Sequence, residues 1–440
     1  MAGTYLHPTS GYIMDAGVYK KRGVISIDEK NYLRELAKRV KEAANKSVQA
    51  EREYNWTEHN DLHSKRPMYI CYPEDGWDDL LPLNSMIVKD PFFANYEWYM
   101  RHLLYRDQYI MDDFVIKPEL ICLVKHHVHN RDWGLGKDSL TISSETTSYD
   151  WGERPLSSFD RLESLKAPEY EIFEEESKSD FEAVSELFSD ILDVDQFIVG
   201  TVFGSSTFSC NQPGIAAHLR GVEQILYDMY DFPDELHALL SFITKANVDF
   251  LKMIESKGLI RSNTDNFYTD AGGNGYTGSL PKPHRKAKLK DCVGYGVAQE
   301  YSEVSPDMHE TFGTEYQNQV LELFGWNAYG CCEPYTNKLD ILKKIPKLRR
   351  ISVSPFNDFE KMAEYIKGDY VYSFKPNPAL LISDITIDTV RKYLFDVISI
   401  AKDCCVEIFL KDIIHLKGEY EKRFLDISKM IGEEIAKVHS

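Results

Sequence analysis

The sequence predicts an α/β protein built on a single (β/α)8 barrel of the TIM type. Short apolar segments alternate with helix-length segments through the last third of the chain, and connections of that length imply parallel strands. The 440 residues would allow about three domains, but one barrel with insertions also reaches this size. Extended over the whole chain, the count of strands and helices fits an eight-stranded barrel better than an open sheet, and no GxGxxG follows a first strand to suggest a dinucleotide-binding fold.

Residues 1–65 are predicted to form a helical extension, and the barrel is expected to cover residues 66–440. Ser26 and Glu29 have the spacing of a capping box, in which each side chain accepts a hydrogen bond from the other residue's backbone N–H group. Apolar residues then recur on one helical face over 33–44, which is typical of a helix packed against a core.

The first barrel strand is expected at 68–72, directly after a proline. Farther along, residues 132–180 are rich in Ser, Thr, Glu and Asp and lack apolar periodicity, so they are predicted to form an acidic insertion. Ser179 and Glu182 offer a second capping box that would begin a helix. The next strand is expected at 197–203, where apolar and β-branched residues gather.

The last third of the chain has the clearest alternation. Strands are expected at 327–333, 348–354, 370–374 and 404–410. Helices are expected at 338–344, 359–366, 385–402 and 420–437. Four strands separated by helices of this length indicate βα crossovers and therefore a parallel sheet.

The composition excludes several classes of partner. The chain has 51 basic and 70 acidic residues, a net charge of −19, which disfavours binding to nucleic acid or to an anionic membrane surface. A basic run at 282–290 is expected to be a solvated loop, with docking of an acidic partner or an anionic cofactor as the alternative. Residues 1–7 lack the features of a secretory signal, and no apolar run approaches the roughly 20 residues of a membrane span. Eight cysteines are too few for a disulfide scaffold, so a reducing, cytoplasmic location is expected.

Functional residues of a β/α barrel lie at the C-terminal ends of its strands. One expected strand ends in Cys331, Cys332 and Glu333, and thiolates with a carboxylate form a suitable donor set for zinc. His309, in the first turn of an expected helix, would complete this metal site. Cysteine also often serves as a small core hydrophobe, so a structural role for these thiols stays open.

Other strand ends supply further candidates. The predicted catalytic residues are Glu333, Lys375, Lys411 and Asp412, because carboxylates and ammonium groups transfer protons and stabilise charge. The predicted substrate-binding residues are His59, Arg66, Gln299, Glu300 and Asn377. For His59 and Arg66, which flank the first strand, a role as structural caps is an equal alternative.

Several segments resemble the uroporphyrinogen decarboxylase superfamily. The likeness is carried by Arg66-Pro67 before the first strand, by 219–224 with 232–235, by 330–333 and by 373–376. The resemblance implies a β/α barrel with one deep pocket at the C-terminal ends of the strands. The superfamily contains porphyrin decarboxylases and also zinc-dependent methyltransferases that work with corrinoid proteins.

The resemblance is nearer to the methyltransferase branch. Porphyrin decarboxylases hold substrate carboxylates with arginines just after the first strand, whereas this chain has Glu74 and Asp75 there. In the methyltransferases a His-x-Cys pair binds zinc; Cys331 matches its cysteine, but Tyr329 stands at the histidine position.

The function implied is transfer of a methyl group between a small methylated substrate and a corrinoid (cobalamin) protein, assisted by zinc. Two alternatives stay open. One is a metal-free decarboxylase or lyase that acts on a small carboxylated substrate. The other is a catalytically inactive barrel that serves as a binding protein.

Overall fold

The computed structural model describes residues 21–437 except 65, 137–140, 143–148, 151–153, 201, 204–205, 270 and 382. The first 20 residues of the expected extension, and parts of the expected insertion, therefore lie outside the described residues. The helix expected after Ser26 is confirmed as α1 (Ile27–Ala44). Its capping box is also confirmed, since Glu29 N donates to Ser26 Oγ over 3.2 Å and Ser26 N donates to Glu29 Oε2 over 2.8 Å.

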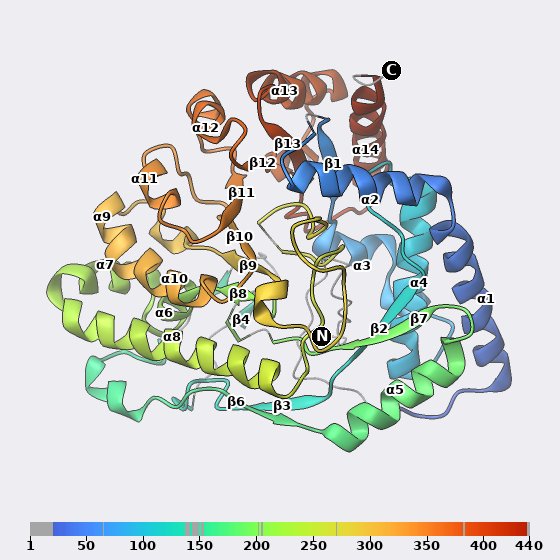
Figure 1. Ribbon diagram of the computed structural model, residues 1–440, viewed down its shortest axis with the longest axis horizontal. Coiled ribbons are helices and arrows are strands. Elements are labelled where there is room, and N and C mark those ends of the chain that lie inside the picture. The colour runs from blue at the N-terminus through green and yellow to red at the C-terminus, as the bar shows by residue number, and fades with distance from the viewer. Residues whose placement is uncertain are drawn as a thin grey trace.

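The fold is mixed α/β, and a seven-stranded sheet forms its centre (Figure 1). In spatial order its strands are β1 (Met68–Cys71), β13 (Cys405–Leu410), β12 (Val371–Phe374), β11 (Leu348–Val353), β10 (Trp326–Tyr329), β9 (Val293–Gly296) and β8 (Ser209–Cys210). Every neighbouring pair is parallel, which confirms the parallel arrangement expected for the last third of the chain. All seven strands therefore end at the same edge of the sheet.

Within the described residues, three two-stranded sheets accompany the main sheet. The strands β2 (Glu119–Leu123) and β7 (Asp193–Phe197) pair in parallel. The other two pairs are antiparallel and join β3 (His126–His129) to β6 (Glu169–Ile172), and β4 (Thr141–Ile142) to β5 (Tyr149–Asp150). The strand expected at 197–203 is wrong in position, because the strand ends at Phe197. Most of β7 is polar and only partly buried. The prediction from apolar residues therefore placed the strand in the apolar segment that follows β7.

Most helices lie outside the main sheet (Figure 1). Besides α1 they are α2 (Ser47–Asn60), α3 (Trp77–Leu80), α4 (Pro91–Tyr109), α5 (Glu174–Phe188), α6 (Gln212–Arg220), α7 (Val222–Asp231), α8 (Pro233–Ser256), α9 (Pro306–His309), α10 (Glu315–Leu321), α11 (Leu339–Leu342), α12 (Phe359–Ile366), α13 (Ile387–Ile400) and α14 (Glu419–Lys437). The helices expected at 338–344, 359–366, 385–402 and 420–437 correspond to α11 to α14, with shorter bounds for α11 and α13.

The expected acidic insertion is partly regular structure. Its end contributes β6, and α5 begins at Glu174 rather than after Ser179. The first turn of α5 consists of three glutamates, whose charge is favourable at the positive end of a helix dipole. Glu174, Glu175 and Glu176 therefore begin a helix inside the span that the sequence predicted to be an acidic insertion.

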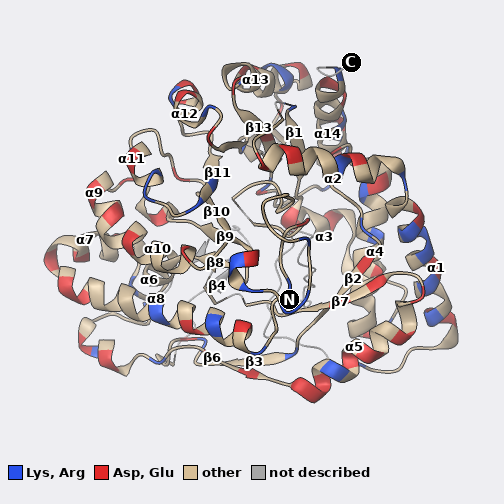
Figure 2. Ribbon diagram, viewed as in Figure 1, with Lys and Arg blue, Asp and Glu red and all other residues tan. Residues whose placement is uncertain are grey.

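The outer surface carries the excess acid. Figure 2 shows Asp and Glu spread over several outer helices, among them α2, α5, α7 and α9, rather than gathered on one of them. Within the described ranges, no helix combines the length and the apolar character that crossing a membrane requires.

Candidate active site

Several thiol, ammonium and carboxylate side chains lie at the C-terminal edge of the main sheet. Glu74 follows β1, Cys331 and Cys332 follow β10, Lys375 follows β12, and Lys411 with Asp412 follows β13. Lys375, Lys411 and Asp412 directly follow their strands, whereas the strand expected at 327–333 ends at Tyr329, so Cys331 and Cys332 lie in the loop after it. These residues share one edge because parallel strands end on the same side of a sheet. Such an edge is where open and closed α/β folds place their ligands.

The end of β13 reaches across the sheet to the end of β10. Lys411 Nζ donates to Cys331 Sγ over 3.8 Å, and Cys331 Sγ lies 3.6 Å from Cys332 Sγ. Two strands, β12 and β11, separate these two strand ends. Because neighbouring strands are about 4.8 Å apart, a contact over three strand intervals requires long side chains on a sheet that curves toward this edge.

The Cys332 thiol is activated by its neighbours. The hydrogen bond with Cys331 lowers the pKa of Cys332, and the charges of Lys375 and Lys411 lower it further, against the opposing effects of partial desolvation and of the Asp412 carboxylate. A thiol with a lowered pKa carries more of the nucleophilic thiolate near neutral pH. Cys332 is also exposed, whereas Cys331 is buried.

Lys411 is held by a carboxylate that the sequence did not single out as a site residue. Its Nζ lies 2.8 Å from Asp412 Oδ1 and 3.8 Å from Glu74 Oε1. Glu74 Oε2 accepts from the backbone N–H of Asp412 over 2.9 Å, and the Tyr268 hydroxyl donates to Glu74 Oε1. Glu74 therefore positions the lysine and the aspartate. The signal that could have identified it was a carboxylate directly after the first strand.

The backbone at this point is strained. Glu74 has φ +49° and Asp412 has φ +60°, in the left-handed region that residues with a Cβ atom seldom occupy. Strain of this kind persists where the surroundings hold it, and it gathers at functional sites.

Lys375 brings a second ammonium group to the same edge. Its side chain is only 3% exposed, and its Nζ lies 5.6 Å from the centre of the Phe409 ring. A charge that is buried in a protein acts more strongly on its neighbours than a charge in water. Lys375 and Lys411 together can attract a carboxylate or stabilise a negative charge that develops during a reaction.

The four expected metal ligands do not form one group. Glu333 Oε1 accepts from Ala298 N at 3.0 Å and from the Tyr335 hydroxyl at 2.5 Å, and Glu333 Oε2 accepts from Cys331 N at 2.8 Å. Its carboxylate is thus committed to holding the loop after β10. His309 is buried, with Nε2 3.3 Å from the Tyr329 hydroxyl. Among the described residues, no three His, Cys, Asp or Glu side chains are placed to hold a metal ion.

Two predicted substrate contacts follow β9 in a 3-10 turn, Gln299–Tyr301. Gln299 is exposed, and Glu300 is half-buried. Burial raises the pKa of Glu300 to about 7, helped by the nearby Glu333 carboxylate. A carboxyl group with this pKa exchanges protons near neutral pH. Asn377 is exposed beyond β12 and accepts from Ala379 N over 3.0 Å, as a turn residue does.

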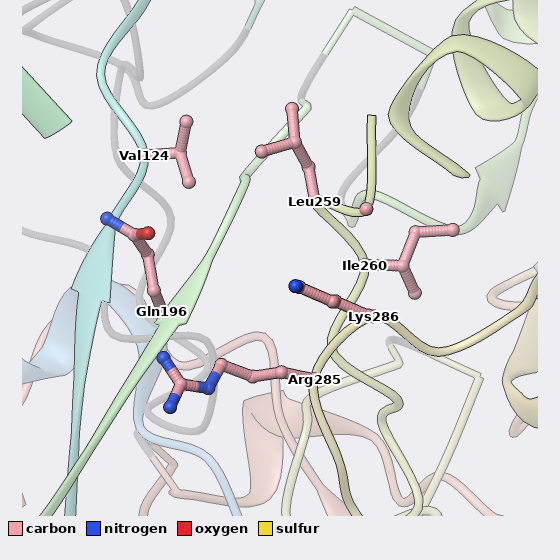
Figure 3. A pocket seen from close by; sticks show the side chains of 7 residues that line it. Val124, Gln196, Leu259, Ile260, Arg285 and Lys286 are labelled. Carbon is pink, nitrogen blue, oxygen red and sulfur yellow. The ribbon is translucent and has the colours of Figure 1, made fainter. Parts of the chain in front are cut away.

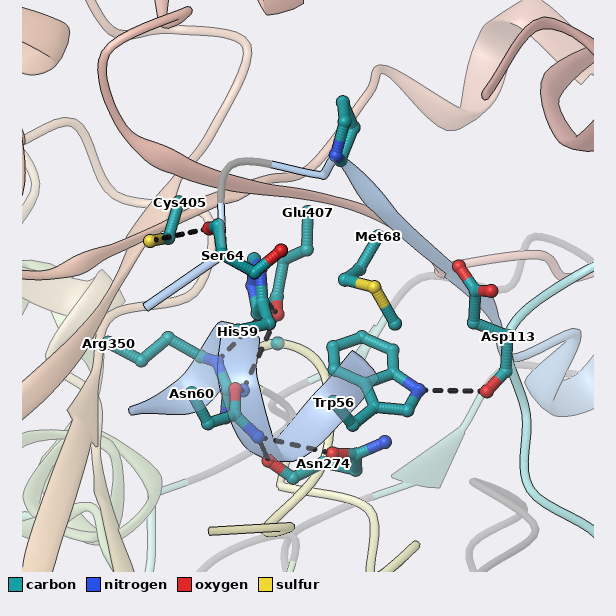
Figure 4. Close-up of polar contacts among 12 residues, drawn as sticks. Trp56, His59, Asn60, Ser64, Met68, Asp113, Asn274, Arg350, Cys405 and Glu407 are labelled. Carbon is teal, nitrogen blue, oxygen red and sulfur yellow. Dashed lines mark hydrogen bonds and ion pairs between the residues drawn. The ribbon is translucent and has the colours of Figure 1, made fainter. Parts of the chain in front are cut away.

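His59 and Arg66 lie away from this edge. His59, at the end of α2, is fully buried with Nε2 3.2 Å from Glu407 Oε2 (Figure 4). Arg66 precedes β1 and pairs with Asp113 over 3.0 Å, so it lies toward the N-terminal end of that strand. Of the two alternatives for these residues, the contacts favour the structural one.

The basic run at 282–290 lines a separate hollow of about 350 Å³ (Figure 3). Gln196, Arg285 and Lys286 lie around it beside apolar Val124 and Ile260. Arg285 Nε is 3.1 Å from Asp195 Oδ1, so part of the basic charge is neutralised within the chain. The prediction of a solvated loop at 282–290 is therefore correct only in part, because Arg285 forms an ion pair within the chain.

No family model matches this chain, and no curated protein matches it. A proposal for the function of this chain therefore depends on the contacts at the C-terminal edge of the sheet.

Proposed function

We propose that the chain is an enzyme, a decarboxylase or related lyase that acts on a small carboxylated substrate. The observation that carries this proposal is the placement of Lys411, whose Nζ lies 2.8 Å from Asp412 Oδ1 and 3.8 Å from Cys331 Sγ. Lys375 adds a second ammonium group at the same edge. An ammonium group beside a carboxylate, close to a second cation, is an arrangement suited to proton transfer and to charge stabilisation.

In decarboxylation the bond between the carboxylate and its carbon breaks, carbon dioxide leaves, and the carbon keeps the electron pair. The ammonium groups of Lys375 and Lys411 stabilise that negative charge. The carbon then takes a proton from Lys411, which regains one from water through Asp412. Asp412 suits this relay because its side chain is 40% exposed, whereas Lys411 is nearly buried.

We also infer that the strands close into the (β/α)8 barrel that the sequence predicts. Arg261 supports this, because it pairs with Glu119 of β2 and Asp195 of β7 over 2.9 and 2.7 Å. Close to it in the chain, the side-chain amide of Asn263 donates to Val293 O of β9 over 2.9 Å. The segment between these residues thus links the small β2–β7 sheet to the main sheet.

Zinc-assisted methyl transfer to or from a corrinoid protein is the second candidate. The adjacent thiols favour it, because Cys331 Sγ and Cys332 Sγ lie 3.6 Å apart and thiolates are preferred zinc ligands. The described Glu333 and His309 do not join them, so the residues present do not fit a full zinc site.

The proposal is tested by measuring carbon dioxide release from a panel of small oxo and hydroxy carboxylic acids. Lys411→Met and Asp412→Asn are each expected to lower turnover by about 10²-fold or more, the usual contribution of a positioned acid or base. Lys392→Met, which removes an exposed lysine of α13, is the matched control and should keep full activity. Full activity in Lys411→Met would overturn the proposed roles.

Metal analysis separates the two candidates. Stoichiometric zinc in the purified protein, lost from Cys331→Ala and from Cys332→Ala, would favour methyl transfer. A corrinoid-protein gene beside this one would favour it further.

A further inference from the structure

The hollow beside the basic segment 282–290 is distinct from the proposed catalytic group (Figure 3). Val124 follows β2, Gln196 belongs to β7, and the other described residues of its lining come from 258–260 and 285–286. Its volume of about 350 Å³ lies in the range of roughly 300–1,000 Å³ that is usual for small-molecule pockets. The hollow therefore has room for a small ligand that takes no part in the proposed reaction.

The lining of this hollow is basic, although the chain as a whole is acidic. Arg285 and Lys286 belong to it, and none of the described lining residues is acidic, whereas the whole chain has a net charge of −19. A concave surface that carries one sign of charge concentrates ions of the opposite sign. The hollow is therefore suited to a negatively charged ligand.

The two cations differ in their ion pairs. Arg285 Nε lies 3.1 Å from Asp195 Oδ1, and the guanidinium carbon of Arg285 lies 5.2 Å from the centre of the Phe181 ring. Among the described residues, no carboxylate forms an ion pair with Lys286. Because a charge that enters a partly enclosed site needs a partner there, a single unpaired ammonium group suits a monoanion better than a dianion such as a phosphate monoester.

The backbone around Lys286 directs its side chain into the hollow. Lys286 has φ +55° and Gly258 has φ +64°, and a Cβ atom added at Gly258 would lie 3.5 Å from Lys286 Cγ. The aliphatic stem thus lies against the bare glycine backbone, and Figure 3 shows the ammonium group pointing toward Gln196. A left-handed conformation is uncommon for a residue with a Cβ atom, and such conformations gather at functional sites.

Apolar side chains line the hollow beside Lys286. Val124 and Leu259 both belong to its lining, as Figure 3 shows. We propose that the hollow binds a small monocarboxylate with a short aliphatic chain. The carboxylate pairs with Lys286, and the chain packs against Val124 and Leu259, where burial removes it from water.

Isothermal titration calorimetry of the full chain with hexanoate tests this proposal. Hexanoate should bind saturably. Butyrate has two fewer methylene groups and should bind about 15-fold more weakly, because each buried methylene contributes about fourfold. Hexanamide has nearly the same size but no charge, and it should bind about tenfold more weakly because it cannot form the ion pair with Lys286.

Three lysine variants show whether the charge that matters is the one in the hollow. Lys286→Met should lower the affinity for hexanoate about tenfold, to that of hexanamide for the wild type. Lys286→Arg keeps the charge and should keep most of the affinity. Lys290→Met is the matched control, because Lys290 is an exposed lysine of the same basic segment outside the described lining, and it should leave the affinity unchanged.

Lys411→Met separates the hollow from the C-terminal edge of the main sheet, where ammonium groups also lie. It should keep the affinity for hexanoate. Loss of binding in Lys411→Met, with binding retained in Lys286→Met, would place the ligand at the sheet edge and overturn the inference. A wild-type chain that shows no saturable binding of hexanoate at millimolar concentrations would overturn it as well.

Discussion

The backbone N–H of Asp412 donates to Glu74 Oε2 over 2.9 Å, and both residues hold left-handed backbone conformations. This bond joins the ends of β13 and β1, which are neighbours in the sheet. It fixes the two carboxylates around Lys411. Both residues are strained, because the left-handed backbone conformation costs a residue with a Cβ atom about 1–2 kcal/mol.

Asp412→Gly is therefore expected to be more stable than Asp412→Ala by about 1 kcal/mol. Both variants remove the carboxylate that lies 2.8 Å from the Nζ of the buried Lys411, but glycine also relieves the strain at φ +60°, by more than the freedom it brings to the unfolded chain. Urea unfolding measures the difference. Asp396→Gly compared with Asp396→Ala, inside α13, is the control, and there glycine should be the less stable by about 1 kcal/mol. A glycine variant less stable than the alanine variant at both positions would contradict strain at Asp412.

Removal of the Glu407 carboxylate should destabilise the fold strongly. Glu407 Oε1 lies 3.1 Å from Arg350 Nε, and both side chains are fully buried (Figure 4). Loss of one partner leaves a buried charge without compensation, so Glu407→Ala should lower the free energy of unfolding by about 3–5 kcal/mol. Urea unfolding at neutral pH gives the value.

The double variant Arg350→Met with Glu407→Leu is the informative companion. It removes both charges and should lose less stability than Glu407→Ala alone, because no unpaired charge remains. Asp396→Ala removes a carboxylate from an exposed pair with Lys392 and should cost less than about 1 kcal/mol. A double variant less stable than the single one would show that the ion pair itself supplies net stability.

Stability should fall as the pH is lowered below 6, in part through His309. Burial, together with the charge of Lys338, lowers the pKa of His309 to about 3, from 6.5 for an ordinary histidine. Between these two values the unfolded chain binds a proton that the folded chain does not, so folding loses free energy as pH falls. The stabilisation that the neutral His309 provides is fully present above pH 6.5.

The His309→Gln variant removes the imidazole that binds this proton in the unfolded chain. Its free energy of unfolding should decline less steeply between pH 6 and pH 5 than that of the wild type, by about 1.4 kcal/mol per pH unit. Urea unfolding at several pH values measures the slope. His63→Gln, at an exposed position, should leave the slope unchanged; equal slopes in wild type and His309→Gln would refute the assignment.

Gly272 should tolerate no side chain. Its φ is +135°, and an added methyl group would overlap Ser373 Oγ and Glu407 Oε1. Gly272→Ala is expected to cost about 3 kcal/mol or more, since it combines backbone strain with an overpacked core. Gly368→Ala, where nothing lies within 4 Å of the added atom, is the control and should change the melting temperature little.

The local pattern of the chain determined much of the fold. The capping box at Ser26 and Glu29 predicted the start of α1 because the two side chains satisfy backbone groups within one helical turn. The alternation after 327 predicted parallel strands, and with them the common edge that holds Cys332, Lys375 and Lys411. These features depend on neighbours in sequence, or on strand direction alone.

The tertiary structure decided which of these residues touch. Lys411 and Cys331 are 80 positions apart, and only the curvature of the sheet brings them together. Glu333 was expected to bind metal or act in catalysis, but its oxygens accept hydrogen bonds from two backbone N–H groups and from Tyr335. Spacing along the chain shows that a carboxylate stands beside two thiols. It does not show which way the carboxylate turns, because that depends on the fold of the loop that holds Cys331 and Tyr335 and on Ala298 N, which follows β9.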